Sequence, residues 1–154
     1  MELVEATKGD LQTLAEYWYA LATEMEPYDE LNDIAVEGPE SAEAGFEDLL
    51  ENEDTTVSLI VADETEVGYL LTRAGEHPSR VRSSYVDIVD LFVALDHRNE
   101  GYGSDAVEAV KRRAAEDGAD YVTVSCEWHN EGARQFYEDN GFTEKQVTYA
   151  CQLD

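Results

Sequence analysis

Hydrophobic residues in the first part of the chain recur at helical spacing. Apolar positions three or four residues apart predict a helix that buries one face. They are Leu11, Leu14, Trp18, Leu21 and Met25. Asp10 stands where it could cap this helix. A second helix is predicted over Pro39 to Glu51, with Ala42, Phe46, Leu49 and Leu50 inward. Between the two helices lies an irregular acidic stretch, long enough to form a loop on the substrate side.

Runs rich in β-branched and aromatic residues predict six strands. They cover Leu3–Thr7, Thr56–Ala62, Val67–Arg73, Tyr85–Val93, Tyr121–Cys126 and Phe142–Leu153. Residues 63–66 predict a hairpin turn between the second and third strands. With four helices, this order predicts a single α/β (α+β mixed) domain over residues 1–154, with a mixed sheet of six or seven strands.

The stretch 98–104, with sequence Arg-Asn-Glu-Gly-Tyr-Gly-Ser, separates a strand from an amphipathic helix that begins near Asp105. Free backbone N–H groups at a helix N-terminus suit a phosphate. Glycine suits this turn because a Cβ would block the close approach of a ligand and because such turns often need a positive φ. Arg98 adds a cation whose planar fork matches phosphate. The stretch therefore predicts a site for a phosphate-bearing ligand.

Two motifs resemble the GNAT N-acetyltransferase superfamily. Leu91-Phe92-Val93 followed by Arg98-x-x-Gly101-x-Gly103 is similar to the family's acetyl-CoA pyrophosphate loop. The second motif, N-x-x-A-x-x-x-Y-x-x-x-G-F, is matched by Asn130, Ala133, Tyr137, Gly141 and Phe142. The resemblance covers essentially the whole chain, and it implies a sheet that splays between the fourth and fifth strands. The chain departs from the family pattern at its C-terminal end, where it has fewer residues than the two final strands of many members.

The resemblance implies a binding site for acetyl-CoA as co-substrate. Backbone amides of Gly101, Gly103 and Ser104, with the Arg98 side chain, would hold the pyrophosphate, and Asn99 and Tyr102 lie in the same turn. Amides near Leu91, Phe92 and Val93 would pair with the pantetheine arm, and Leu91 would polarise the thioester carbonyl. Asn130 and Tyr137 would meet the pantetheine from the opposite side. No spacing of His, Cys and Asp indicates a metal site.

The implied reaction is direct transfer of an acetyl group to a primary amine in a ternary complex. An alkylamine is neutral in only about one molecule in 2,500 at pH 7, so a proton acceptor helps. Asp87 falls where several relatives place a glutamate, and it would act directly or through water. Asp90 is the second candidate, expected on the other face by strand alternation. Tyr137 would protonate the leaving thiolate.

The acceptor is not identified by the sequence. Tyr28 and Asp29 lie in the acidic first half and are candidate substrate contacts beside Asp87. An acidic first half favours a cationic amine, small or peptide-borne, as the partner. A homodimer is a further expectation, because dimers are common in the family.

The net charge is −26, from 36 acidic and 10 basic residues. Since 43% of the residues are hydrophobic, this is no disordered acidic tail. Salt screens such self-repulsion, so the composition predicts a salt-adapted organism. The charge argues against nucleic acids and anionic membranes as partners. The longest apolar runs are too short to cross a bilayer, and the first residues do not resemble an export signal, which favours a cytoplasmic location.

Two alternative functions remain open. Gly101-x-Gly103-x-x-Ala106 satisfies the loose dinucleotide pattern, with Glu127 as a ribose acceptor, so a Rossmann-type domain for a dinucleotide or S-adenosylmethionine is the first. Against this alternative, the charged segment from Leu95 to Glu100 separates the strand from the first glycine. The dinucleotide pattern needs the glycine turn almost directly after the strand. The second is a GNAT-like module that binds CoA without turnover.

Overall fold

The computed structural model describes all residues from 1 to 154. Five strands and four α-helices follow one another along the chain, joined by short 3₁₀ turns. The strands are β1 (Glu2–Glu5), β2 (Thr55–Ala62), β3 (Thr65–Glu76), β4 (Ser84–Val93) and β5 (Tyr121–Val124). The helices are α1 (Leu11–Met25), α2 (Glu43–Glu51), α3 (Tyr102–Glu116) and α4 (Glu131–Asp139).

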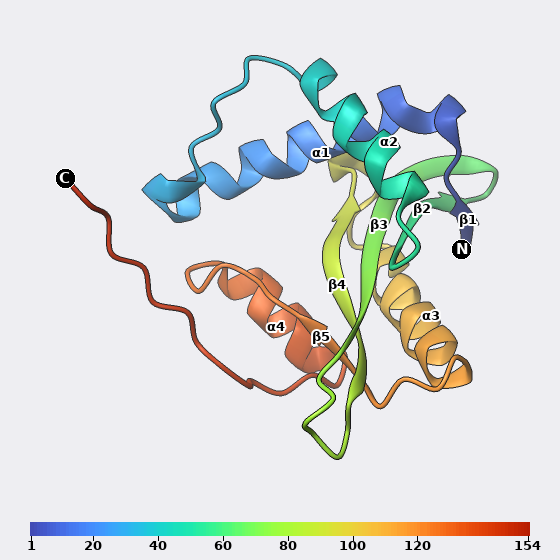
Figure 1. Ribbon diagram of the computed structural model, residues 1–154. Coiled ribbons are helices and arrows are strands. Elements are labelled where there is room, and N and C mark those ends of the chain that lie inside the picture. Colours follow the sequence, from blue (N-terminus) through green and yellow to red (C-terminus); the bar gives the residue numbers. More distant parts are fainter.

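The strands form one mixed sheet in the order β1-β2-β3-β4-β5. β1 to β4 pair antiparallel with their neighbours, and β5 joins β4 in parallel. Strand alternation sends one set of side chains to each face of the sheet. α1 and α2 cover one face, while α3 covers the other (Figure 1). The mixed sheet with four helices confirms the predicted fold class.

Each face of the sheet has its own hydrophobic core. On the α1–α2 face, Leu14 and Phe46 pack with Tyr69 and Phe92 from the sheet. On the α3 face, Leu70 and Ile88 pack with Val107 and Val110 of α3, and Phe136 of α4 borders the same cluster. The helical stripe predicted for α1 is thus confirmed, because Leu14 is fully buried and Leu11, Trp18 and Leu21 pack on the first core.

The regular pairing of β4 is interrupted in the middle of the strand. Its register with β3 shifts so that Leu71 pairs with Asp90 while Thr72 pairs with Ile88, which leaves Val89 as the extra residue of a β-bulge. Pairing with β5 ends at the same point, with Ile88 opposite Val124. The second half of β4, residues 89–93, therefore has a neighbour on the β3 side only. This is the predicted divergence of the fourth and fifth strands.

The prediction of six or seven strands is wrong, since the sheet has five. The segment Phe142–Leu153, expected to form the last strand, has no regular structure. A strand needs a partner for its backbone groups. After α4 this segment runs away from the sheet and so pairs with no strand (Figure 1, red). The capping role expected for Asp10 is also wrong: its carboxylate accepts from the N–H of Thr7 at 2.9 Å and does not cap α1.

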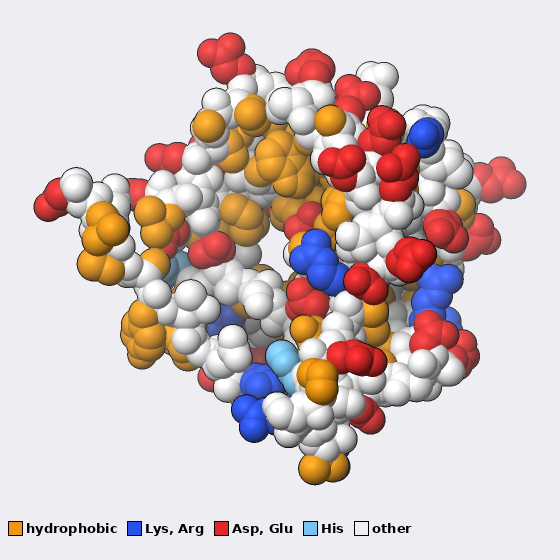
Figure 2. Space-filling model, viewed as in Figure 1, with side chains coloured by type: hydrophobic (Ala, Val, Ile, Leu, Met, Phe, Trp, Pro, Cys, Tyr) orange, Lys and Arg blue, Asp and Glu red, His pale blue; other side chains and the backbone are white.

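Acidic side chains are spread over the visible surface, and basic ones are few (Figure 2). None of the helices has both the length and the apolar composition needed to cross a membrane.

Candidate active site

The glycine stretch forms a turn that ends at the N-terminus of α3. Gly101 is the N-cap residue with φ of +86°, and Asn99 also has positive φ at +65°. The first intrahelical bond runs from the N–H of Asp105 to the carbonyl of Gly101, at 3.0 Å. No side chain caps the helix, so the preceding amides, those of Tyr102, Gly103 and Ser104, lack intrahelical partners. Such a row of amides attracts an anion.

Two different constraints require the two glycines. At Gly101 nothing lies within 4 Å of the position that a Cβ would take, so the positive φ alone favours glycine. At Gly103 a Cβ would lie 3.2 Å from Cζ of Phe136. The lack of a side chain at Gly103 therefore lets the start of α3 pack closely against Phe136 of α4. The expectation of a positive φ is confirmed at Gly101, while the close neighbour of Gly103 is Phe136 of α4.

Replacing Gly101 by alanine should lower the free energy of unfolding by about 1–2 kcal/mol, because a Cβ disfavours the left-handed region. Gly45, inside α2 with free space around it, is the matched control, and Gly45→Ala should be stabilising. Thermal unfolding of both variants at high salt measures the difference. A Gly101→Ala variant as stable as Gly45→Ala would contradict the strain assigned to this turn.

The second half of β4 leads towards this turn. Leu91, Phe92 and Val93 pair with Leu70, Tyr69 and Gly68 of β3, and no strand faces them on the other side. Apart from the Val93 carbonyl, which accepts from Arg98, the backbone groups on that side are free to bond an extended ligand, as the edge of a sheet does. Position 68 on β3 needs glycine for a packing reason, since a Cβ there would lie 1.9 Å from the carbonyl oxygen of Phe92.

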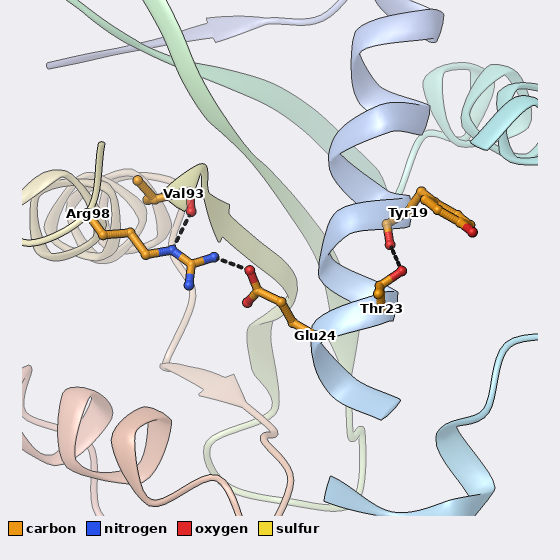
Figure 3. A network of polar contacts seen from close by, with 5 residues as sticks. All are labelled: Tyr19, Thr23, Glu24, Val93 and Arg98. Atoms are coloured by element: carbon orange, nitrogen blue, oxygen red, sulfur yellow. Dashed lines mark hydrogen bonds and ion pairs between the residues drawn. The ribbon is translucent and has the colours of Figure 1, made fainter. Parts of the chain in front are cut away.

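Arg98 joins the end of β4 to α1. Its Nε donates to the carbonyl of Val93 at 2.7 Å, and its Nη2 lies 2.7 Å from Oε1 of Glu24 (Figure 3). The guanidinium carbon is 5.5 Å from the centre of the Phe92 ring. The side chain thus points at α1, where the hydroxyl of Thr23 bonds the carbonyl of Tyr19 one turn away. The pairing with Glu24 had no signal in the sequence.

Two carboxylates of β4 lie on the same face of the sheet. Asp87 pairs with Arg73 and Asp90 with Leu71, and since these β3 partners are two residues apart, both acids share one face. The prediction that Asp90 lies on the opposite face from Asp87 is therefore wrong. Simple alternation fails because Val89 is inserted between the paired residues.

The two carboxylates have different surroundings. Asp87 lies where β4 and β5 are still paired, and its Oδ1 accepts from the hydroxyl of Thr123 at 2.7 Å. Asp90 lies just past the end of this pairing and accepts from the hydroxyl of fully buried Tyr69 at 2.8 Å. Burial raises the pKa of Asp90, and the Tyr69 hydrogen bond lowers it by a smaller amount. Asp90 therefore holds a proton more strongly than an ordinary aspartate does.

Tyr137 lies on α4 in an aromatic cluster. Its ring packs edge-on against Phe136 and Phe142, with centroids 5.1 and 5.7 Å away. Burial, followed by the charges of Cys126 and Asp90, raises the pKa of Tyr137 to about 12. Asp90 is thus one of the charged groups that raise the pKa of the Tyr137 phenol. The phenol stays protonated at neutral pH.

The remaining candidates are less closely grouped. Asn130 caps α4, with Oδ1 accepting from the N–H of Ala133 at 3.0 Å, which confirms the predicted helix start. Tyr28 is half-buried at the end of a 3₁₀ turn after α1, and exposed Asp29 caps the next turn through the N–H of Leu31. No hydrogen bond or ion pair joins Tyr28 or Asp29 to β4. No group of three His, Cys, Asp or Glu side chains is arranged to hold a metal ion.

Comparison with known proteins identifies the family. The profile of the Acetyltransferase (GNAT) family matches residues 15–142. A protein of Bacillus subtilis (strain 168), named "Uncharacterized N-acetyltransferase YhfO", is 30% identical over 105 residues, which are 68% of this chain and 70% of that protein.

Solved structures share the fold over nearly the whole chain. A tetramutant of the BH1408 protein from Bacillus halodurans has a TM-score of 0.88 at 22% identity, covering 99% of this chain and 100% of that one. A putative acetyltransferase from Agrobacterium tumefaciens str. C58 has a TM-score of 0.77 at 21% identity, covering 99% and 100%. The chain belongs to the GNAT acetyltransferase family.

Proposed function

We propose that this protein transfers an acetyl group from acetyl-CoA to a primary amine in a ternary complex. The observation that carries the proposal is that two sets of free backbone amides follow each other along the chain. One set is the open side of β4 from residue 89 to 93, and the other is the uncapped N-terminus of α3. An extended pantetheine arm suits the strand edge, and a diphosphate suits the helix end.

In this proposal the amides of Gly101, Gly103 and Ser104 hold the diphosphate, with Asn99 and Tyr102 shaping the turn. The amides of Leu91, Phe92 and Val93 bond the pantetheine arm, and Leu91 also polarises the thioester carbonyl. One such donor contributes about 2.7–4 kcal/mol in other acyl-transfer enzymes. Asn130 and Tyr137 border the arm from the α4 side.

Arg98 has a second role in the proposal. Its bonds to Val93 and Glu24 use Nε and Nη2, so the third guanidinium nitrogen remains available for the diphosphate. The bridge to Glu24 also fixes the end of α1, and with it the loop that carries Tyr28 and Asp29. Arg98 then connects the coenzyme site to the acceptor side.

The proposed chemistry needs a proton acceptor and a proton donor. A carboxylate of β4 accepts the proton of the attacking amine, while Tyr137 donates its phenolic proton to the sulfur as the C–S bond breaks. Asp87 is a candidate acceptor through a water molecule. We favour Asp90, because it lies just past the end of the β4–β5 pairing, burial raises its pKa, and its charge contributes to the raised pKa of Tyr137.

The proposed acceptor is a cationic amine. The half of the chain that forms α1, α2 and their connection carries one basic residue, Lys8, against twenty acidic residues up to Thr72. An anionic surface concentrates amines near the site, and Asp29 is exposed there. Such a surface also keeps nucleic acids and anionic membranes away.

Ligand-induced stabilisation at high salt tests the proposal. Acetyl-CoA and CoA should raise the melting temperature, and NAD should not. At a ligand concentration of 100 Kd the gain is about 2.7 kcal/mol. Stabilisation by NAD alone would favour the dinucleotide fold instead. A thiol-release assay with a panel of amines then separates an enzyme from a CoA-binding module, because the module would release no thiol with any amine.

We further propose that the acidic surface is an adaptation to a saline cytoplasm. Charge repulsion at −26 should unfold the protein near 0.1 M salt, and screening should restore the fold near 2 M, where the Debye length falls to roughly 3 Å or below. Circular dichroism across a KCl series measures this. Full stability in dilute buffer would contradict the adaptation.

A further inference from the structure

The acidic surface is interrupted at the connection between β3 and β4. The stretch 77–86 contains no Asp or Glu, and part of it lines a surface pocket of about 610 Å³. Basic and histidine side chains gather at the lower end of Figure 2, where this connection lies in Figure 1. The pocket lining includes His77, Arg80, Arg82, Tyr121 and Lys145, and no acidic side chain is part of it. The pocket is therefore locally positive.

The cations of this pocket do not stabilise the fold through ion pairs. None of the ion pairs in the structure involves Arg80, Arg82 or Lys145, although the chain has 36 acidic residues for 10 basic ones. All three side chains belong to exposed residues. Arginine binds carboxylates through two parallel hydrogen bonds. The group is therefore available to the acidic side chains of another molecule.

The pocket adjoins the face of the sheet that carries the two carboxylates of β4. Tyr85 and Asp87 are two residues apart on β4 and point to one side, and Tyr121 faces the same way because it pairs with Tyr85. The rings of Tyr85 and Tyr121 stack with centroids 5.5 Å apart, and His77 stacks on Tyr85 at 4.9 Å. Since His77 and Tyr121 both line the pocket, this stack connects it to the face with the carboxylates.

The pairing of β3 with β4 gives the distance between the pocket and the proposed base. Leu71 pairs with Asp90 and Gly75 with Tyr85, so four residues of β3 separate Asp90 from the aromatic stack. At about 3.3 Å per residue the separation is roughly 13 Å. The surface between them is open, because the core under α1 and α2 ends at Leu71 and Arg73 is exposed. One amino acid is too short for this span, whereas about four residues of an extended peptide cover it.

The charges at the two ends of this surface are opposite. Carboxylates lie at one end and attract a protonated amine, while the cations of the pocket lie at the other. We propose, on the basis of the proposed acetyltransferase function, that the acceptor is an acidic peptide. Its amine lies at Asp90, and Asp or Glu side chains four or five positions away bind Arg80, Arg82 and Lys145. These three residues determine specificity and do not take part in the chemistry.

Acetylation of designed peptides tests the proposal at the lowest KCl concentration that keeps the protein folded. The first peptide has two aspartates at positions 5 and 6, counted from the residue with the amine. The second has them at positions 2 and 3, and the third has serine in their place. Each is made with a free N-terminus, or with a blocked N-terminus and lysine first. The value of kcat/KM should be about 10-fold higher for the first peptide than for the other two.

The outcomes separate this inference from the proposed function. Equal kcat/KM values for the three peptides, or acetylation of small amines but of no peptide, would overturn the inference alone. Absence of acetylation with every peptide and every small amine would overturn both. Stimulation of the serine peptide by free citrate would make the pocket an effector site and would also overturn the inference.

Charge removal identifies the residues that read the acidic positions. Replacing Arg80 and Arg82 together by serine should remove the preference, so that the three peptides react alike. Arg112 and Arg113 are exposed on α3, and replacing both by serine removes the same charge elsewhere, so this control should keep the preference. Fluorescence anisotropy with dye-labelled peptides measures the same ranking without turnover. A preference that survives in the Arg80 and Arg82 variant, or that falls equally in the control, would overturn the assignment.

Discussion

Replacing Tyr137 by phenylalanine is expected to lower kcat by about 100-fold or more while leaving CoA affinity nearly unchanged. The ring stays in its cluster with Phe136 and Phe142, so only the proton donor is lost. Burial raises the pKa of Tyr137 to about 12, which keeps the proton on the phenol until the sulfur leaves. A thiolate formed in the same buried site is also less stable than in water, which favours the transfer. Steady-state kinetics with acetyl-CoA and CoA titrations measure the two effects separately.

Tyr19→Phe provides the matched control. That hydroxyl donates to the carbonyl of Glu37 on the surface, so its removal should change kcat only slightly. If Tyr137→Phe reduced kcat and CoA affinity equally, Tyr137 would be a packing residue. An unchanged kcat would remove it from the chemistry altogether.

Asp90→Asn should also reduce kcat/KM by about 100-fold or more, because the amide cannot accept the proton of the amine. Asp87→Asn is the control of equal size on the same strand and the same face. Its Asn Oδ1 can still accept from the Thr123 hydroxyl in the paired part of β4, so this variant should have the smaller effect on rate. The opposite ranking would assign the role to Asp87.

The pH dependence distinguishes a base from a structural acid. Asp90 accepts a proton only when ionised, so activity should fall as the pH drops through its raised pKa. The bond from Tyr69 lowers that pKa, and Tyr69→Phe should therefore move the acid limb of kcat/KM to higher pH. An acid limb that does not move in Tyr69→Phe would mean that another group controls it.

Local patterns were sufficient to predict most of the fold. The apolar stripe of α1, the hairpin between β2 and β3 and the glycine turn before α3 depend on residues close together in the chain, so spacing and turn chemistry reveal them. The positive φ of Gly101 and the cap by Asn130 belong to the same group. Their positions within two short motifs also made the family recognisable.

The errors arise where a distant partner decides the structure. The face of Asp90 depends on the bulge at Val89, which exists only in the pairing with β3. Arg98 bonds Glu24, a residue 74 positions earlier, and no local pattern encodes that pair. The segment Phe142–Leu153 has the alternation of a strand, but alternation cannot show whether a partner strand lies beside it.

A crystal structure with CoA, grown at high salt, tests the proposed coenzyme site most directly. We expect the diphosphate within hydrogen-bonding distance of the amides of Gly101, Gly103 and Ser104. The pantetheine arm should lie along the open side of β4, with its sulfur near Tyr137. CoA bound at any other surface, or no binding under these conditions, would contradict the proposed function.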